Sequence, residues 1–358
     1  LTSVVDLLAA VPSLIYGLWG LFFLQPRLVK VSKWLADHLG FIPIFDVDSD
    51  GPRSVYTATV AGNVRLDFTV ANASSSQLQA VMGAADQTQA ADVIAWVRSA
   101  RFGIGNAGIS LSRLGAVETS TPAILTPPAI PIWYSFASTA DKARHVAFQN
   151  AYSDRRRLVL FGSKSGMVHA IQSNPTSIAT APSGQEAWAF VPPKIASQMI
   201  GDYTTSTAAG ATEVSAFPDG SPTLADYRRS DGTFATAAII GGGNGGKSIV
   251  ALDVTETVDP DSGAIVGPTP MWTATPGNGD AGQGHSKPAV ARVLVGGSER
   301  YFVITGTGIA YDNPAAPWEK GRIVAAYDLA TGELVWQFKA ACALTSDVAV
   351  FETDDELE

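Results

Sequence analysis

A glycine-rich turn between two apolar segments constrains the fold of this chain more than any other feature. Residues 237–254 read AAIIGGGNGGKSIVALDV, and residues 241–248 match the G-x-x-x-x-G-K-S signature of phosphate-binding loops. Such a loop leads into a helix, whose N-terminal amides hold the phosphates. Here it leads into residues 249–254, which are short, apolar and rich in β-branched side chains. The pattern therefore favours a β-hairpin with an exposed Lys247 over a nucleotide site.

The alternation of strand, glycine turn and strand recurs through the second half of the chain. It is found in residues 158–171 (LVLFGSKSGMVHAI), in 237–254, and in 301–308 together with 321–338. Residues 286–295 (SKPAVARVLV) supply a further inner strand. Each unit therefore contains about four short strands, which is the size of a propeller blade. A strand with a tryptophan closes each unit, and we expect these side chains to pack between blades: Trp188, Trp272 and Trp336.

The number of units is too small for the chain to form a closed propeller ring. About three are visible, with a long insertion between residues 192 and 233, and a propeller needs at least about four blades. A new strand at 346–351 follows the third unit. We therefore expect a mainly β fold with an incomplete β-propeller, either cut within a blade or completed by other residues.

Composition agrees with a turn-rich β protein that is exported. Hydrophobic residues make up 46% of the chain and charged residues 16%, with 34 glycines and 21 prolines. The net charge of −9 argues against a nucleic-acid surface. The single cysteine, Cys342, excludes a disulfide within the chain and paired-cysteine metal sites. Its alanine neighbours predict a small buried residue.

The N-terminal part has a different character. Residues 7–24 carry no charge over a length that can cross a bilayer. They fit a signal sequence, although no basic region precedes them, or a membrane anchor, or a buried helical segment, which we favour. The basic residues Arg27, Lys30 and Lys33 would keep the rest of an anchored chain inside the cell, against export.

Between this segment and the repeats, the pattern predicts mixed helical and β structure. Residues 53–70 indicate two strands joined at Gly62, and 71–80 a linker. Residues 89–98 indicate a short helix, and the proline-rich 122–131 an edge segment. We therefore divide the chain into an N-terminal segment, residues 1–85, and a propeller portion, residues 86–358.

Five motifs in a fixed order resemble a known family. They are RLGAVETSTPAIL (113–125), RRRLVLFGSKSGMVHAI (155–171), GQEAWAFVPP (184–193), GGKSIVALDVT (245–255) and YDLATGEL (327–334). Together they resemble the C-terminal propeller of the PilY family, also called PilC, of type IV pilus biogenesis and tip-adhesin proteins. The resemblance covers about residues 88–351. Ala116 stands where the family pattern has an acidic residue.

The resemblance implies a scaffold without enzymatic activity. Such proteins are exported to the pilus tip or outer surface, promote pilus extension and mediate attachment to surfaces. Minor pilins of the tip complex and a host or abiotic surface are the implied partners. Many members bind calcium through an Asp-x-Asp-x-Asp-Gly loop in the propeller, which makes Ca²⁺ the implied cofactor.

One stretch of this chain has that calcium pattern. Asp46, Asp48 and Asp50 alternate ahead of Gly51, so their carboxylates can converge on one hard cation. Thr57 stands where a bidentate glutamate is expected, and the loop lies outside the matched propeller. A solvated acidic turn is the alternative. The acidic residues near the C-terminus lack this spacing and make a weaker candidate: Asp354, Asp355, Glu356 and Glu358.

The remaining candidates for chemistry favour structural roles. His169 lies among apolar residues and is expected to be a satisfied core histidine, while His145 and His285 have no partner at ligand spacing. The run 155–157 of three arginines predicts a solvated start of a strand. No Ser-His-Asp arrangement stands out. The alternative functions are a quinoprotein-like dehydrogenase with a quinone and Ca²⁺, or an ATPase that uses Lys247.

Overall fold

The computed structural model describes residues 53–99, 114–135, 137–173, 184–209, 215–277, 280–283, 286–296, 298–310 and 319–350. The chain divides into two compact units, residues 1–45 and 46–358, and all described residues belong to the second. The apolar segment 7–24 and the acidic loop 46–51 lie outside the described residues. Within the described part, no helix is long and apolar enough to cross a membrane.

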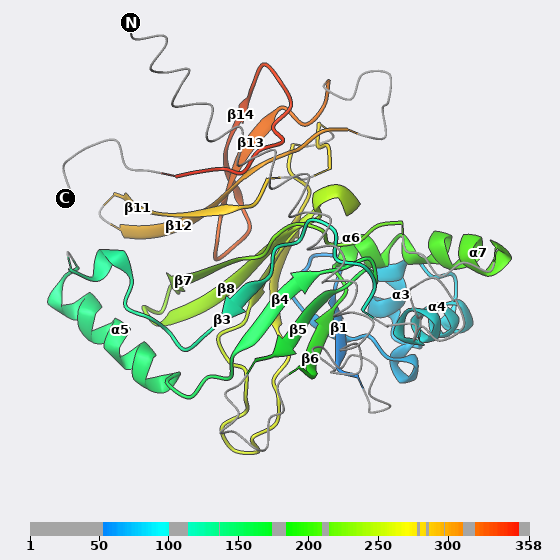
Figure 1. The fold of residues 1–358 in the computed structure, drawn as a ribbon, viewed down its shortest axis with the longest axis horizontal. Helices are drawn as coiled ribbons and strands as arrows, with labels where there is room; N and C mark the ends of the chain where they lie inside the picture. Colours follow the sequence, from blue (N-terminus) through cyan, green and yellow to red (C-terminus); the bar gives the residue numbers. More distant parts are fainter. Residues whose placement is uncertain are drawn as a thin grey trace, which may run out of the picture. The chain divides into compact units, whose positions relative to one another are not determined.

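The first of three sheets has six strands in the order β2-β1-β6-β5-β4-β3 (Figure 1). From β3 to β6 the strands run antiparallel in chain order, and β1 then pairs in parallel with β6. The predicted edge segment is correct, because β3 pairs only with β4. The strands are β1 (Val55–Ala58), β2 (Arg65–Asp67), β3 (Ala123–Leu125), β4 (Leu158–Gly162), β5 (Val168–Gln172) and β6 (Glu186–Phe190).

The second and third sheets each contain four antiparallel strands in chain order. The strands of the second are β7 (Thr223–Arg228), β8 (Phe234–Gly241), β9 (Ile249–Asp253) and β10 (Thr269–Ala274). Those of the third are β11 (Ala289–Val295), β12 (Ser298–Gly306), β13 (Ile323–Asp328) and β14 (Leu334–Lys339). The predicted four-stranded unit is therefore confirmed. The described residues form a mixed α/β fold and do not show a closed ring.

Helices cover one face of the first sheet. Figure 1 shows α3 (Ser76–Met82), α4 (Gln87–Ser99), α6 (Pro193–Ala196) and α7 (Met199–Ala209) gathered beside it. Their apolar side chains share a core with Val55, Met167 and Ala189 of the sheet or its turns. The linker predicted at 71–80 is wrong, because Ser75 caps α3 and the helix buries Leu78 and two neighbours. The helix predicted at 89–98 is confirmed as part of α4.

Tryptophans join consecutive sheets. Trp188 on β6 is buried in one core cluster with residues of β8 and β9. Trp272 on β10 is buried against the third sheet, where its Nε1 donates to the Leu329 carbonyl at 2.8 Å. A Cβ added to Gly332 would lie 2.4 Å from Cγ of Trp272, and the φ of Gly332 is 73°. Only glycine fits this turn without strain.

The third tryptophan departs from the prediction. Trp336 on β14 is 51% exposed, and every residue of this edge strand is exposed. Its ring stacks on Phe338, a neighbour on the same face. The described residues place no sheet on the far side of β14, so the apolar pattern alone did not decide burial.

Two other expectations meet the structure in different ways. Cys342 is exposed, so the predicted burial is wrong; it follows β14 in a segment outside the core clusters. The strands β1 and β2, which precede the expected boundary at residue 85, are part of the first sheet. The hairpin predicted at 53–70 is confirmed, with antiparallel pairing of Tyr56 with Asp67.

Candidate functional site

The glycine-rich loop is the turn of a β-hairpin, as predicted. Gly241 of β8 pairs with Ile249 of β9, and a short 3₁₀ turn, Gly243–Gly245, lies between them. The backbone of this turn is bound by its neighbours: the Phe217 amide donates to the Gly245 carbonyl at 3.1 Å. The loop leads into a strand, so it lacks the helix N-terminus that a phosphate-binding loop requires. Lys247 is half-buried rather than exposed.

A buried polar network surrounds His169. Its Nδ1 lies 2.7 Å from Oε1 of Glu186, and its Nε2 lies 2.8 Å from the Ser165 hydroxyl. Glu186 also accepts two bonds from the Arg53 guanidinium, at 2.7 and 2.9 Å. Ser163 donates to the Leu114 carbonyl, which leaves the Ser165 hydroxyl as the donor to His169. The network therefore ties β5 and β6 to Arg53, which lies two residues before β1.

Burial fixes the charges in this network. It lowers the pKa of His169, although the Glu186 carboxylate partly opposes that effect. Burial alone would raise the pKa of Glu186, but hydrogen bonds from His169 and Arg53 lower it to about 2. His169 is accordingly neutral, with Nδ1–H donating to an ionised Glu186 that is paired with Arg53.

Ser165, His169 and Glu186 are hydrogen-bonded in the same sequence as the residues of a catalytic triad, but a substrate cannot reach them. His169 is fully buried, and Ser165 is 1% exposed. The ring of Phe161 stacks on the imidazole. A nucleophile must reach its substrate, and this hydroxyl does not. The prediction of a satisfied core histidine is confirmed.

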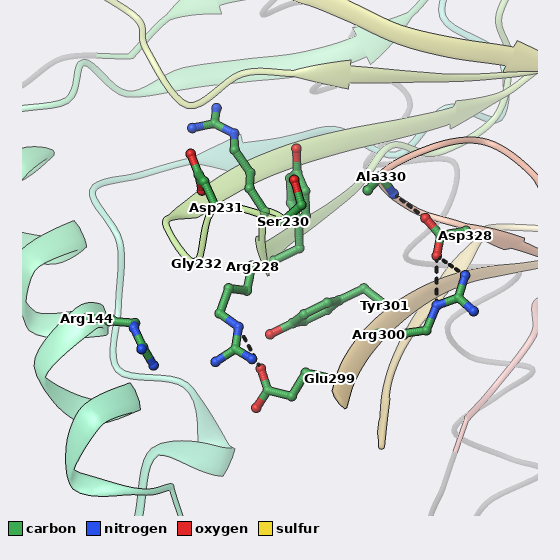
Figure 2. Close-up of a pocket in the computed structure, with 12 residues that line it drawn as sticks. Arg144, Arg228, Ser230, Asp231, Gly232, Glu299, Arg300, Tyr301, Asp328 and Ala330 are labelled. Carbon is green, nitrogen blue, oxygen red and sulfur yellow. Dashed lines mark hydrogen bonds and ion pairs between the residues drawn. The ribbon is translucent and has the colours of Figure 1, made fainter. Parts of the chain in front are cut away.

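An open cleft lies between the second and third sheets, with a volume of about 420 Å³ (Figure 2). It gathers one end of several elements: the β7–β8 turn, the start of β12, the turn after β13, and α5 (Thr139–Ala151). The turn of residues 229–233 is shaped by a bond from the Arg229 amide to the Thr233 carbonyl and by Gly232, whose φ is 85°. The arginines that line the cleft are Arg144, Arg228, Arg229 and Arg300.

Each of these arginines is paired with a carboxylate. Arg228 bonds Asp141 at 2.7 Å and approaches Glu299 at 3.5 Å, and Asp141 also accepts from Arg144 at 2.9 Å. The Ser138 hydroxyl and both guanidiniums lower the pKa of Asp141. The other two pairs are Arg229 with Asp253 at 2.5 Å and Arg300 with Asp328 at 2.6 Å.

Tyr301 lies in the middle of this arrangement. Figure 2 shows its ring between Arg228 and Arg300, with Glu299 beside it. The hydroxyl is buried and lies close to the Arg292 guanidinium, although no pair meets strict hydrogen-bond geometry among the described residues. Burial raises the pKa of Tyr301 to about 12, although the Arg292 guanidinium partly opposes that effect, so the group is neutral and keeps its proton for donation.

Sequence reasoning missed this cleft. Four of its charged residues occur as two short pairs of neighbours, 228–229 and 299–300, and others, such as Arg144 and Asp328, come from further segments that are distant in sequence. The arginine run that did stand out lies elsewhere. Arg155 is 8% exposed rather than solvated, and its guanidinium donates to the Thr126 carbonyl and at 2.8 Å to the Thr236 hydroxyl. These bonds satisfy a cation that the pattern placed in water.

The predicted calcium ligands Asp46, Asp48 and Asp50 lie outside the described residues, as do His285 and the acidic C-terminal residues. Thr57, at the expected glutamate position, is buried in β1 and donates to the Val191 carbonyl at 2.7 Å. In the described part of the chain, no group of three His, Cys, Asp or Glu residues can hold a metal ion. The calcium hypothesis stays a prediction.

Comparison with known proteins finds similarity over most of the chain to one kind of protein and over a short stretch to another. No family model matches the chain. Over 294 residues it is 29% identical to the type IV pilus biogenesis factor PilY1 of Pseudomonas aeruginosa, covering 80% of this chain and 23% of that protein. Over 67 residues it is 40% identical to the phosphate transport system permease protein PstC 2 of Mycobacterium bovis, covering 18% of this chain and 21% of that one. The chain thus spans less than a quarter of the length of either relative.

One solved structure is similar to part of the chain. The crystal structure of the Pseudomonas aeruginosa PilY1 C-terminal domain aligns with a TM-score of 0.38 at 23% identity, over 57% of this chain and 35% of that chain.

Proposed function

The chain belongs to the PilY1 family of type IV pilus biogenesis factors, and from this premise we propose that it is an exported, non-enzymatic protein of pilus assembly. The observation that carries the proposal is the length of the similarity, which extends over 80% of the chain. A match of that extent reflects a shared fold and not a single recurring turn.

A propeller-like scaffold suits this role. Three sets of four antiparallel strands follow one another along the chain, namely β3–β6 of the six-stranded first sheet and the whole second and third sheets, and Trp188 and Trp272 join each set to the next. We propose that these sets are blades of a propeller. The burial of the Ser165 hydroxyl supports a role without catalysis, because the triad-like network cannot receive a substrate.

At the cell surface the proposed role has three parts. The protein promotes extension of the pilus, contacts minor pilins at the tip, and attaches the pilus to a surface. Calcium bound by Asp46, Asp48 and Asp50 would order the acidic loop. The quinoprotein-like dehydrogenase stays an alternative prediction from the sequence.

A deletion strain tests the proposal. We expect few surface pili by electron microscopy and reduced attachment, with both restored by the gene in trans. Deletion in a background that cannot retract pili separates the two roles: pili that return without attachment indicate a role against retraction and in adhesion. Normal pilus number together with normal attachment in the deletion strain would overturn the proposal.

The calcium part of the proposal is tested on the purified protein, by measuring its melting temperature with and without calcium. Asp48→Asn removes one of the three carboxylates, and we expect it to abolish any calcium-dependent rise in the melting temperature. Glu118→Gln, an exposed carboxylate elsewhere, serves as the matched control. A melting temperature that does not respond to calcium in the unmodified protein would remove the calcium part and leave the pilus part intact.

A further inference from the structure

We propose that the cleft between the second and third sheets binds the carboxylate of an acidic sugar. This inference goes beyond pilus assembly and does not depend on it, because it rests on the cleft alone. Three observations carry it: which charges face the solvent, which donors remain for a ligand, and the size and polarity of the space.

The surface that a ligand meets is cationic, although the ion pairs are balanced in number. The arginine side chains that line the cleft are 24–50% exposed, whereas the carboxylates that pair with them are 8–17% exposed. The acids therefore lie behind the guanidiniums and hold them in place. One acidic residue of the lining, Asp231, is itself exposed.

The guanidiniums keep donors for a ligand. A guanidinium has five N–H donors in a planar fork that matches a carboxylate. Arg144 uses Nη1 to reach Asp141, and Arg300 uses Nε and Nη2 to reach Asp328. Figure 2 shows these two arginines on opposite sides of the cleft, with Tyr301 between them. The neutral Tyr301 hydroxyl, which is buried beside Arg292 without strict hydrogen-bond geometry to any described residue, adds a further donor.

The space suits one or two sugar rings. Its volume of about 420 Å³ lies at the lower end of the range for small-molecule sites. The lining is mostly polar, which disfavours a lipid, and it offers acceptors as well as donors. Ser230 and Asp231 can accept hydrogen bonds from sugar hydroxyls. The small volume of the cleft also favours a sugar over an extended acidic peptide.

Calorimetry on the purified full chain tests the proposal, with trigalacturonate as the charged probe and galactotriose as its neutral counterpart. We expect trigalacturonate to bind and galactotriose to bind at least about tenfold more weakly, since a charge-assisted pair is lost. Raising the salt concentration should weaken the charged probe only. Absence of trigalacturonate binding, or equal binding of both sugars, would overturn the proposal.

Two variants locate the site. Arg144→Gln and Arg300→Gln should each weaken trigalacturonate binding by about tenfold, and Arg144→Lys should weaken it less. Lys339→Gln is the matched control, because Lys339 is an exposed cation paired with Asp280 at 2.7 Å outside the cleft. The proposal fails if the arginine variants bind like the unmodified protein, or if Lys339→Gln has the same effect.

A further titration tests whether the cleft prefers the carboxylates of an acidic peptide to those of an acidic sugar. Hexaglutamate should bind more weakly than trigalacturonate at equal ionic strength. Tighter binding of hexaglutamate, with loss in Arg144→Gln, would overturn the sugar and assign the cleft to an acidic peptide. None of these outcomes bears on pilus number in a deletion strain, so failure here is distinct from failure of the assembly role.

Discussion

The His169 network and the arginine cleft use the same chemistry in opposite surroundings. Both join distant segments through ion pairs between arginine and carboxylate. In the network, the side chains of Arg53 and Glu186 are 5% and 6% exposed. In the cleft, Arg144 is 50% exposed and its partner Asp141 17%. Exposure, and not the kind of residue, separates them.

The difference teaches what each region can do. A buried charge must keep its partner, because water is not there to replace it. The network therefore fixes strand positions and offers nothing to a ligand. An ion pair of an exposed guanidinium contributes little to stability. The arginines of the cleft can therefore exchange a carboxylate of the protein for an anionic ligand at a small cost in free energy.

The largest effect is expected from Glu186→Ala. This change leaves the Arg53 guanidinium and the His169 Nδ1–H without their acceptor, which should lower the free energy of unfolding by about 3–5 kcal/mol. Urea unfolding of the purified chain measures it. Glu118→Ala is the control, since Glu118 pairs with Lys164 at 40% exposure and should cost at most about 1 kcal/mol. Equal costs for the two variants would remove the distinction between the regions.

A smaller effect is expected on acidification. The pKa of His169 lies below its usual 6.5 in the fold, so the unfolded chain binds the proton first as the pH falls below about 6.5. Stability should therefore decrease with falling pH, and a second loss should follow between about 4.5 and 2 as Glu186 protonates.

Substitution of the histidine sharpens that test. His169→Gln should reduce the slope of unfolding free energy against pH just below 6.5. It should not abolish the slope, because burial also lowers the pKa of His145. Urea unfolding at several pH values between 8 and 5 measures the slope. A slope that His169→Gln leaves unchanged would contradict the neutral, buried histidine.

The smallest effect on stability is expected from Asp141→Asn. The carboxylate pairs with Arg144 and Arg228 in a partly exposed position, so its loss should cost about 1 kcal/mol or less. It should also raise trigalacturonate affinity a few-fold, because both guanidiniums lose a competing anion. Asp280→Asn, which removes an exposed carboxylate from Lys339, should leave the affinity unchanged. A fall in affinity for Asp141→Asn would contradict the cationic cleft.

Much of the β structure could be predicted from sequence. Glycine turns between β-branched segments predicted the β4–β5 and β8–β9 hairpins, because such local signals need no knowledge of distant residues. Trp188 and Trp272 are buried as expected. Trp336 has the same local pattern and is exposed, because burial depends on what lies beyond the strand.

The site depended on contacts that local patterns do not encode. Arg53 and Glu186 are separated by 133 positions, and Arg300 and Asp328 by 28. A charged residue in a sequence predicts a solvated side chain, and for this reason Arg155 was wrongly predicted to be exposed. Its acceptors are Thr126, which directly follows β3 of the first sheet, and Thr236 on β8 of the second sheet. Only the tertiary arrangement shows which charges are satisfied inside and which face a cleft.

The glycine-rich loop matches a phosphate-binding signature, but its close packing indicates that the glycines, and not the lysine, are the positions least tolerant of substitution. A Cβ on Gly245 would lie 2.1 Å from the Phe217 carbonyl oxygen, and one on Gly243, whose φ is +54°, would lie 2.7 Å from the backbone of Asp219. In a nucleotide-binding loop the lysine is the residue that a saturation scan cannot replace. In this loop we expect the least replaceable positions to be glycines, because a Cβ on Gly242, Gly243 or Gly245 would meet neighbouring backbone atoms.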